Sequence, residues 1–507
     1  MKIIHTNEIN PEDLPAFDRE LCYNGLDCVI TAEVLSVLLP QLDNHTTATY
    51  SFSRSLQGPA LEMRLRGVKI DPARRARVLD EYYDLVDRLD ANLERLCGEG
   101  WGMWEFNWRP NSKDPLELFY NRMQIPAIKK AGRPTCDRDA LEKLESYFIA
   151  LPIVRHIILL RDIWKKIQVL KTEIDPDGRM RTSYNIAGTN TGRFSSSFSE
   201  FGTGGNLQNI EDSLRSVFIA DEGMKFGYFD GEQIQSRIVG AMEWNLFQDG
   251  LYLDSCESGD LHTTVAKLCW PELPWTGKVK QDKEIAEQPF YRHYTRRFMC
   301  KKIGHGTNFD GKAPEISRQT KIEQKVIEEF QPKYHTAFPA HRRWKEWTQQ
   351  ELIDHGYIVD LSGRKRYFFG RRNDAATVRE ALAYQAQATE AHIVNSGMLN
   401  VWRERNALLS MQQHDAVLIQ FPEDREEETL EIIKKQLRVP MQLEHGREFI
   451  VPFGCKTGWN FGSYSKDNVD GLKDWEGGDE RVRGPAVSLL DRVIRGSRKQ
   501  SRKRGGL

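Results

Sequence analysis

Apolar residues recur at helical spacing in the first third of the chain and predict an arm of helices. The three longest stretches are dense in Arg and Lys and cover 76–96, 140–148 and 154–170. An aromatic, proline-containing segment at 101–115 interrupts them. A shorter amphipathic stretch, which begins at Asp27 and ends before Pro40, predicts one further helix near the N-terminus.

Short runs of β type follow the arm. The clearest are 225–230 and 408–421, and long helical patterns lie between them. This layout predicts an α+β fold in which the two runs share one sheet, with 241–374 inserted between them as a mostly helical subdomain. From 463 onward the apolar periodicity is lost and the chain ends in a basic run, so 463–507 is predicted to be a disordered tail.

The composition fits a large protein with several subdomains. The 507 residues are 39% hydrophobic and 29% charged, too long a chain for one compact core. No run approaches the roughly 20 consecutive apolar residues of a membrane helix, and the first residues lack the apolar run of a signal peptide. The eight cysteines include no Cys-x-x-Cys pair, which argues against a zinc site or a disulfide framework. We therefore expect a soluble, cytoplasmic protein with reduced thiols.

Two aspartates at predicted strand ends are candidate metal ligands. Asp230 ends the run 225–230, and Asp415 interrupts the run 408–421 at a position typical of a hairpin turn. Two carboxylates on adjacent strands can hold two Mg²⁺ ions about 3.5–4 Å apart, which suits in-line phosphoryl transfer. Taken singly, each aspartate is better explained as a turn former.

Four side chains spaced four residues apart form a second candidate site. On a helix they make one slowly winding ridge, with two cations at one end and two flat rings at the other; they are Arg297, Lys301, His305 and Phe309. The ridge suits a nucleoside triphosphate, because the cations can bind phosphates, the Lys can protonate the departing pyrophosphate, and the rings can support sugar and base. A solvated helix face is the alternative interpretation.

A third candidate site combines an arginine with amide side chains. Arg193 lies in Thr-Gly-Arg-Phe-Ser-Ser, and a Gly-rich spacer leads on to Asn206-Leu-Gln208-Asn-Ile. Such groups can contact the minor-groove acceptors that every correct base pair presents, and so check the shape of a pair without reading its sequence. A loop without function is the alternative, and we prefer it for the spacer at 202–205 itself.

The order of these segments resembles the family A, DNA polymerase I-like, DNA polymerases. The segments 191–193 and 206–210 together look like the template-primer segment of that family, 230–237 like its first catalytic motif, 297–309 like its fingers helix, and His414-Asp415 like its last catalytic motif. The resemblance spans 51–462 and includes further similarities at 59–71, 107–126, 259–263, 379–387 and 457–462.

The resemblance implies a right-hand polymerase fold with an antiparallel palm sheet and helical fingers and thumb. Carried over to this chain, its divisions are an N-terminal segment at 1–50, the lead into the palm at 51–73, a thumb at 74–171, palm at 172–240 and 375–462, fingers at 241–374 and the basic tail at 463–507. The implied reaction is template-directed addition of dNTPs to a primer 3′-hydroxyl, with release of pyrophosphate and with two Mg²⁺ ions, for which Mn²⁺ can substitute.

The resemblance also assigns roles to individual residues. The metal ligands would be Asp230, Asp415 and the backbone carbonyl of Gly231, and Lys301 would be the general acid. The dNTP would contact Arg297, Lys301, His305, Phe309, Gln235 and His262. The primer-template DNA would contact Arg193, Asn206, Gln208, Gln387, His414 and Arg379.

Four positions depart from the family pattern. Gln235 and Phe309 stand where the family generally has a Glu–Tyr pair beside the sugar. A Gln amide is nearly the size of Glu, so we predict that DNA-type sugar selection is kept, strict or relaxed, although the charge and the tyrosyl hydrogen bond are lost. His305 replaces Phe or Tyr, which predicts altered discrimination of dideoxynucleotides in a direction left open. Ala416 replaces a third acid, which a two-metal scheme does not need.

The N-terminal segment contains Tyr23 and Asp27, which match the Tyr-x-x-x-Asp pattern of the last proofreading-exonuclease motif of such polymerases. The 22 residues before Tyr23 leave no room for the earlier Asp-x-Glu motif, so we predict no 3′→5′ exonuclease from this chain alone. The segment is interpreted either as a remnant helix on the palm or as a dock for a separate exonuclease subunit. These features favour a phage-type protein that replicates viral DNA in the cytoplasm of a bacterial host.

Other classes of function remain open at this point. A catalytically inactive, polymerase-like DNA-binding replication component would explain Gln235, Phe309 and Ala416, although both aspartates and the Arg–Lys pair are kept. A metal-dependent phosphohydrolase would need further His and Asp ligands, and no convincing set is found. An RNA polymerase or reverse transcriptase would differ only in sugar and template preference. The basic run from Arg498 is interpreted as a salt-sensitive DNA contact or as a solvated tail.

Overall fold

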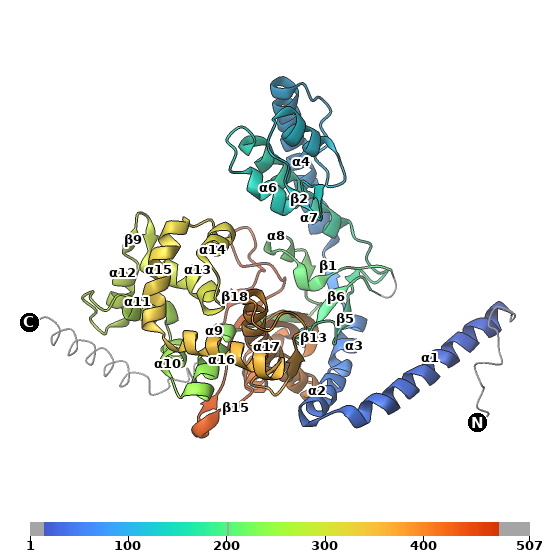
Figure 1. The fold of residues 1–507 in the computed structure, drawn as a ribbon. Coiled ribbons are helices and arrows are strands. Elements are labelled where there is room, and N and C mark those ends of the chain that lie inside the picture. Colours follow the sequence, from blue (N-terminus) through green and yellow to red (C-terminus); the bar gives the residue numbers. More distant parts are fainter. Residues whose placement is uncertain (1–14, 200–201, 476–507) are drawn as a thin grey trace, which may run out of the picture.

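The computed structural model describes residues 15–199 and 202–475, in which a body of helices and sheet carries two projecting parts (Figure 1). One is an arm of helices, and the other is the N-terminal helix. The predicted α+β class is confirmed, since long helices surround an antiparallel sheet. The predictions for 1–14 and for the tail from 476 onward lie outside the described residues.

The N-terminal helix is longer and more exposed than its sequence pattern predicts. Helix α1 (Ala16–Leu38) begins eleven residues before Asp27, and none of its residues is buried. Together with the 3₁₀ turn η3 (Leu39–Gln41) it is long and apolar enough, by length and composition, to cross a membrane. The sequence analysis did not single out this segment, because polar residues interrupt its apolar run, whereas its mean hydropathy is 1.4.

The arm spans the predicted helical stretches and has a hydrophobic core of its own. Helix α4 (Pro72–Trp101) begins at Asp71, whose side chain accepts a hydrogen bond from the Arg74 amide, and ends at Gly102 in the left-handed conformation. Its long partner is α7 (Leu151–Lys171). The shorter elements of the arm are α5 (Asp114–Leu116), the π-helix η4 (Glu117–Arg122), β2 (Lys129–Lys130), β3 (Arg133–Pro134) and α6 (Arg138–Leu144).

The central sheet has five strands in the order β13-β14-β8-β17-β18, and every neighbouring pair is antiparallel. The strands are β8 (Met224–Gly231), β13 (Leu408–Gln413), β14 (Ala416–Pro422), β17 (Phe453–Gly458) and β18 (Lys473–Asp474). The predicted sharing of one sheet is confirmed. Strand β14 reads as a continuous apolar run because Val417 and Ile419 pack into the main core while Leu418 packs into a smaller core on the other face.

The predicted helical insertion is confirmed between β8 and β13. It contains α9 (Ile234–Phe247), α10 (Leu251–Glu257), α11 (Leu261–Cys269), α12 (Val279–Ala286), α13 (Arg296–Asn308), α14 (Ala313–Thr320), α15 (Gln324–Ala337) and α16 (Ala340–His355), with the hairpins β9 (Pro289–Tyr291)–β10 (Tyr294–Thr295) and β11 (Tyr357–Val359)–β12 (Lys365–Tyr367). Helix α17 (Ala375–Glu404) then crosses the body, and 18 of its 30 residues are buried, which makes it a central support of the fold.

The remaining elements complete the body around the sheet. They are α2 (Asn44–Ser55), α3 (Gln57–Arg66), β1 (Val68–Ile70), β4 (Arg179–Met180), β5 (Ser183–Asn185), β6 (Ser195–Ser197), η5 (Leu207–Asn209), α8 (Asp212–Arg215), β7 (Phe218–Ile219), η6 (Glu423–Arg425), α18 (Glu426–Leu437), β15 (Met441–Gln442), η7 (Glu444–Gly446) and β16 (Glu448–Phe449). Strand β1 joins β4 and β7 in a small sheet that connects the arm to the body.

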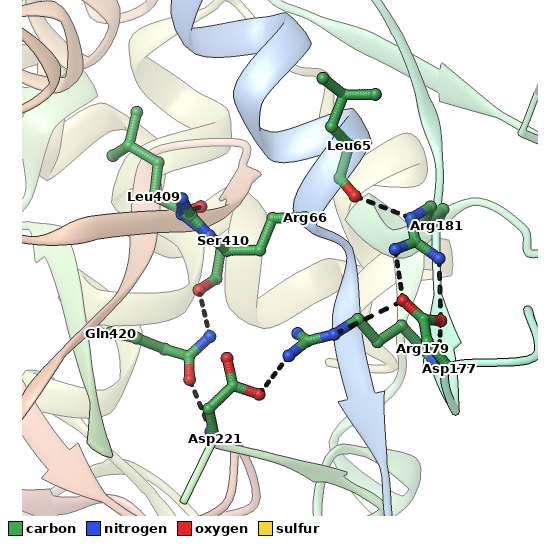
Figure 2. Close-up of polar contacts among 9 residues, drawn as sticks. All are labelled: Leu65, Arg66, Asp177, Arg179, Arg181, Asp221, Leu409, Ser410 and Gln420. Carbon is green, nitrogen blue, oxygen red and sulfur yellow. Dashed lines mark hydrogen bonds and ion pairs between the residues drawn. The ribbon is translucent and has the colours of Figure 1, made fainter. Parts of the chain in front are cut away.

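A chain of ion pairs and hydrogen bonds ties this small sheet to the central sheet (Figure 2). Arg181 binds Asp177 and donates to the carbonyl oxygen of Leu65. Arg179 binds Asp221, whose amide donates to the side chain of Gln420 on β14. A pocket of about 630 Å³ lies beside these arginines. Because carboxylates balance their charges, we interpret this region as a structural joint.

The predicted tail begins too early in the sequence. Residues 463–475 have defined structure: Leu472 is buried, and β18 pairs with β17 through Lys473 opposite Thr457. The amide of Trp475 donates a 3.0 Å hydrogen bond to the carbonyl oxygen of Cys455. Strand β18 could not be predicted from the sequence, because a strand of two residues has no periodicity of its own and depends on a distant partner.

Candidate functional site

Asp230 near the end of β8 and Asp415 in the turn that leads into β14 lie at the same end of the central sheet. Asp230 is paired in register with Ala416, and the amide of Gly231 donates a 3.1 Å hydrogen bond to the carbonyl oxygen of Asp415. The predicted hairpin turn at His414-Asp415 is confirmed. His414 adopts a left-handed conformation with a φ of 53°, which lets the chain reverse in two residues and keeps its ring exposed.

The two carboxylates influence each other electrostatically. Partial burial and the like charge of Asp415 raise the pKa of Asp230 to about 6, and the cations of Lys456 and Arg215 oppose this shift. Arg215 is fixed by the ring of Phe461, 4.7 Å from its guanidinium carbon. The sequence analysis missed both cations, because each comes from a segment with no recognisable motif and reaches the aspartates only through the sheet.

The oxygen atoms at this end of the sheet fit Mg²⁺. Two carboxylates and the backbone carbonyl of Gly231 are hard ligands, and protein-bound Mg²⁺ typically takes one or two carboxylates together with water and substrate phosphates. Within 15–199 and 202–475, no three His, Cys, Asp or Glu side chains gather as a metal site. The site is therefore of the open kind, in which a cation would also offset the repulsion between Asp230 and Asp415.

Helix α13 presents the predicted ridge on the side opposite its buried face. Met299, Cys300 and Ile303 face the main core. Lys301 and His305 are exposed on the other side of the helix. Phe309 follows the last helical residue, with its ring 5.2 Å from that of His305 and 6.3 Å from that of Trp344. The ridge thus runs from cations to rings as predicted, although its last member ends the helix.

His262 joins the cationic end of the ridge. It lies in the first turn of α11, whose N-cap Asp260 is 3.4 Å from Arg297 through both carboxylate oxygens. Burial and the nearby charge of Arg297 lower the pKa of His262 to about 4, with a smaller contribution from Lys301. Arg297, Lys301 and His262 therefore form one basic cluster, in which the imidazole is neutral at pH 7.

Arg193 lies in a loop that helix α17 holds in place. Gly192 before it has a φ of 77°, and a side chain there would collide with Arg364. The side-chain amide of Asn395 donates a 3.2 Å hydrogen bond to the carbonyl oxygen of Gly192. Arg193 itself donates a 2.6 Å hydrogen bond to Glu390, a fully buried residue that the sequence analysis missed. Its only signal is a single acid in an Ala-rich helical run.

The amide side chains of the predicted DNA segment have different environments. Asn206 is exposed and caps η5 by accepting a hydrogen bond from the amide of Gln208. Gln208 is buried, and its side chain donates a 2.7 Å hydrogen bond to Gln412 on β13. Its backbone oxygen accepts a hydrogen bond from Gln413. Gln208 therefore connects this loop to the central sheet, whereas Asn206 faces solvent.

The other predicted site residues lie on α9 and α17. Gln235 is half-buried in the first turn of α9, one turn beyond Gly231. Gln387 is half-buried in the middle of α17, and Arg379 is half-buried near its start. Arg193 and Gln235 both lower the pKa of Glu390, against a larger upward shift that burial causes, so the two side chains lie near this carboxylate.

Comparisons with a family sequence model and with individual proteins point to the same family. The sequence model of DNA polymerase family A matches residues 79–462. The thermostable DNA polymerase I of Thermus aquaticus is 28% identical over 425 residues, which are 78% of this chain and 47% of that protein. DNA polymerase I of Deinococcus radiodurans is 25% identical over 446 residues, which are 82% of this chain and 43% of that protein. The chain thus spans less than half the length of these two relatives.

Comparison with solved structures supports the fold. The POL domain of Pol1 from M. smegmatis, in complex with DNA primer-template and dNTP, aligns with a TM-score of 0.64 at 21% sequence identity. The alignment covers 80% of this chain and 69% of that one. It confirms the right-hand polymerase fold. Since the family match runs from the arm to the end of β17 and beyond, this chain belongs to DNA polymerase family A.

Proposed function

We propose that the chain is a DNA-directed DNA polymerase, which adds dNTPs to a primer 3′-hydroxyl under the direction of a template. The observation that carries the proposal is the placement of Asp230 on β8 beside Asp415, which directly precedes the paired strand β14 of the same sheet. The basic cluster of Arg297, Lys301 and His262 supplies the complementary triphosphate site. Membership of family A and the fold agree with this activity.

The residues present fit two Mg²⁺ ions bound by Asp230, Asp415 and the carbonyl oxygen of Gly231. When bound, such ions stabilise the attacking and leaving oxygens of an in-line phosphoryl transfer, and Mn²⁺ would substitute. The chain's own cations do the rest: Arg297 binds the outer phosphates through its planar fork, and Lys301 gives its proton to the departing pyrophosphate. Neutral His262 donates or accepts a hydrogen bond at the same phosphates.

We assign the remaining predicted residues to the sugar and base of the dNTP and to the DNA, beyond the carboxylates of Asp230 and Asp415. Gln235, His305 and Phe309 would surround the sugar and base of the dNTP. Arg193, Asn206, Gln208, Gln387, His414 and Arg379 would line the path of the primer-template. In this proposal the palm comprises 172–240 and 375–462, the thumb is the arm at 74–171, and the fingers are the insertion at 241–374.

We further propose that the protein replicates viral DNA in the cytoplasm of a bacterial host, and that a separate 3′→5′ exonuclease subunit docks on α1. Two properties of α1 support the docking. It has 23 residues, none of them buried, and large apolar side chains such as Phe17, Leu21 and Val34 are about half exposed or more. Tyr23 and Asp27 lie one helical turn apart on it, which places both on one face.

Extension of a labelled primer-template tests the polymerase activity. Wild-type protein with Mg²⁺ and dNTPs should extend the primer according to the template, and Asp415→Asn should lower the rate by about 100-fold to 1,000-fold or more. Asp424→Asn is the matched control, since Asp424 is exposed beyond the opposite end of β14 and should leave the rate unchanged. Intact DNA binding without extension by the wild type would instead favour the catalytically inactive, DNA-binding replication component.

The docking proposal has its own test. Purified protein should form a complex with a candidate exonuclease protein encoded beside it, measured by light scattering, and Val34→Lys with Leu38→Lys should abolish the complex. Substitution of Glu20 and Glu33, which are exposed and not apolar, by Lys provides the control. Unchanged binding by the Val34/Leu38 variant, or a homodimer in place of the complex, would overturn the assignment of α1 to this partner.

A further inference from the structure

Glu390 is a buried acid that no part of the proposed reaction uses. It lies in the middle of α17, its side chain is fully buried, and its Oε1 atom accepts the 2.6 Å hydrogen bond from Arg193. Its Oε2 atom has no hydrogen-bond partner among the described residues. Since burying a carboxylate is costly even when one of its oxygen atoms is paired with a cation, the presence of Glu390 at this position needs an explanation other than stability.

The ion pair places the guanidinium of Arg193 in a defined orientation. Arg193 has 24% of its side chain exposed, so one edge of its fork contacts Glu390 and part of the rest reaches the surface. Asn395, five residues after Glu390 on α17, fixes the carbonyl oxygen of Gly192. Helix α17 therefore holds the loop at two points. Asn395 binds the loop backbone at Gly192, and Glu390 binds the side chain of Arg193.

The electrostatic surroundings of Glu390 connect it to the acidic site. Burial raises the pKa of Glu390, and the charge of Asp415 acts in the same direction. The cation of Arg193 opposes this shift, as does the nearby side chain of Gln235 at the start of α9. Arg193 is therefore the partner that compensates the charge of this buried acid.

We propose that Glu390 is a positioning residue that orients Arg193 toward the primer end. It acts through Arg193 and does not touch the substrates. A single acid on α17 thereby fixes the side chain of the loop that would sense the last base pair. This inference rests on the proposed polymerase function.

A double-mutant cycle on Arg193→Ala and Glu390→Gln tests the proposal, because Glu390→Gln keeps the volume and removes the charge. Glu390→Gln should lower kcat for extension of a matched primer end by about 10-fold, the scale of one charge-assisted hydrogen bond, and leave the KM for dNTP within about twofold. It should also reduce the preference for matched over mismatched ends. In the Arg193→Ala background Glu390→Gln should change kcat by less than about twofold.

The same cycle is measured on binding of matched and mismatched primer-templates without dNTP, by fluorescence anisotropy. If the wild type binds but does not extend, the polymerase proposal fails while the binding cycle still decides the role of Glu390. Additive effects of the two substitutions, or an unchanged preference for matched ends in Glu390→Gln, would overturn the positioning role.

A matched control separates positioning from stability. Gln385→Met removes another buried polar side chain of α17, whose partners are Trp344 and Thr348 at 3.1 Å. It should lower the melting temperature and leave the preference for matched primer ends unchanged. If Glu390→Gln fails to fold, the same double-mutant cycle is measured with Glu390→Asp. This substitution keeps the charge but shortens the side chain by one methylene, which moves the carboxylate away from Arg193.

Discussion

Arg297 and Asp260 face each other across 3.4 Å, with both guanidinium and carboxylate engaged at two atoms. Asp260 is the N-cap of α11, so the pair joins the start of α11 to the first turn of α13. At this distance the contact is long for a charge-assisted hydrogen bond. Arg297 is therefore held in place by a partner that a phosphate, with closer contacts, can displace.

This pairing leads to a prediction for His262, whose pKa of about 4 in the free protein reflects burial and the charge of Arg297. The binding of tripolyphosphate adds negative charge beside the imidazole and neutralises Arg297, so the pKa of His262 should rise by one unit or more. By linkage, tripolyphosphate should bind more tightly as the pH falls toward 5. Histidine NMR titrations of wild type and His262→Gln measure both effects, and a pKa of His262 that tripolyphosphate leaves unchanged would contradict the basic cluster.

Sugar selection should depend on the volume of Gln235. We expect the wild type to insert dNTPs more efficiently than the matching rNTPs, because the Gln side chain keeps the bulk of a steric gate. Gln235→Ala removes that bulk and should lower the dNTP-to-rNTP ratio of kcat/KM by about 10-fold, the scale of one well-placed steric contact. Single-nucleotide insertion assays measure the ratio. Equal insertion of both sugars by the wild type would refute DNA-type selection.

Asp360 predicts a pH dependence of stability. It is buried in the turn between β11 and β12, where it accepts hydrogen bonds from the amides of Ser362 and Arg364, and burial raises its pKa to about 6. A raised pKa means that folding favours the protonated form, so this contribution to stability is present below pH 4 and is lost as the pH rises through 6.

Comparison with Asp360→Asn isolates this contribution. From pH 4.5 to 7.5 the free energy of unfolding of the wild type, relative to Asp360→Asn, should fall by about 2 kcal/mol. Urea denaturation at several pH values measures the difference. A difference between the two proteins that is independent of pH would show that Asp360 ionises normally.

The separate core of the arm predicts a local response to mutation. Leu160 is fully buried in that core, and Leu160→Ala should destabilise the arm by about 2–5 kcal/mol. Hydrogen exchange should increase through 72–171 and remain unchanged in the central sheet. Leu430→Ala, in the main core, should show the reverse pattern. Uniform loss of protection in either variant would mean that the two cores unfold together.

Local patterns in the sequence were sufficient for the elements that carry the proposed chemistry. The spacing of four residues along α13 and the polar break at His414-Asp415 are properties of short segments, so the helix and the hairpin could be predicted without knowledge of their neighbours. That the runs 225–230 and 408–421 share one sheet was also predicted, because both are apolar runs of β type, and the structure pairs β8 with β14.

What could not be predicted depends on distant partners. The edge strand β18 exists because of β17, and the exposure of α1 depends on what lies beside it in the fold. The role of Glu390 depends on Arg193, which lies 197 residues away in the sequence, and the Ala-rich helical pattern around Glu390 does not indicate that contact. Lys456 and Arg215 act on Asp230 only because the sheet and α8 bring them near it.

The long insertion between β8 and β14 also determines when the acidic site can exist during synthesis. Asp230 leaves the ribosome early, but its strand neighbour follows only after the whole of α9 to α17. A nascent chain stopped before β13 therefore contains Asp230 but lacks Asp415 and the β13–β14 hairpin that pairs with β8. The topology itself therefore delays the assembly of the two carboxylates until β14 has been synthesised.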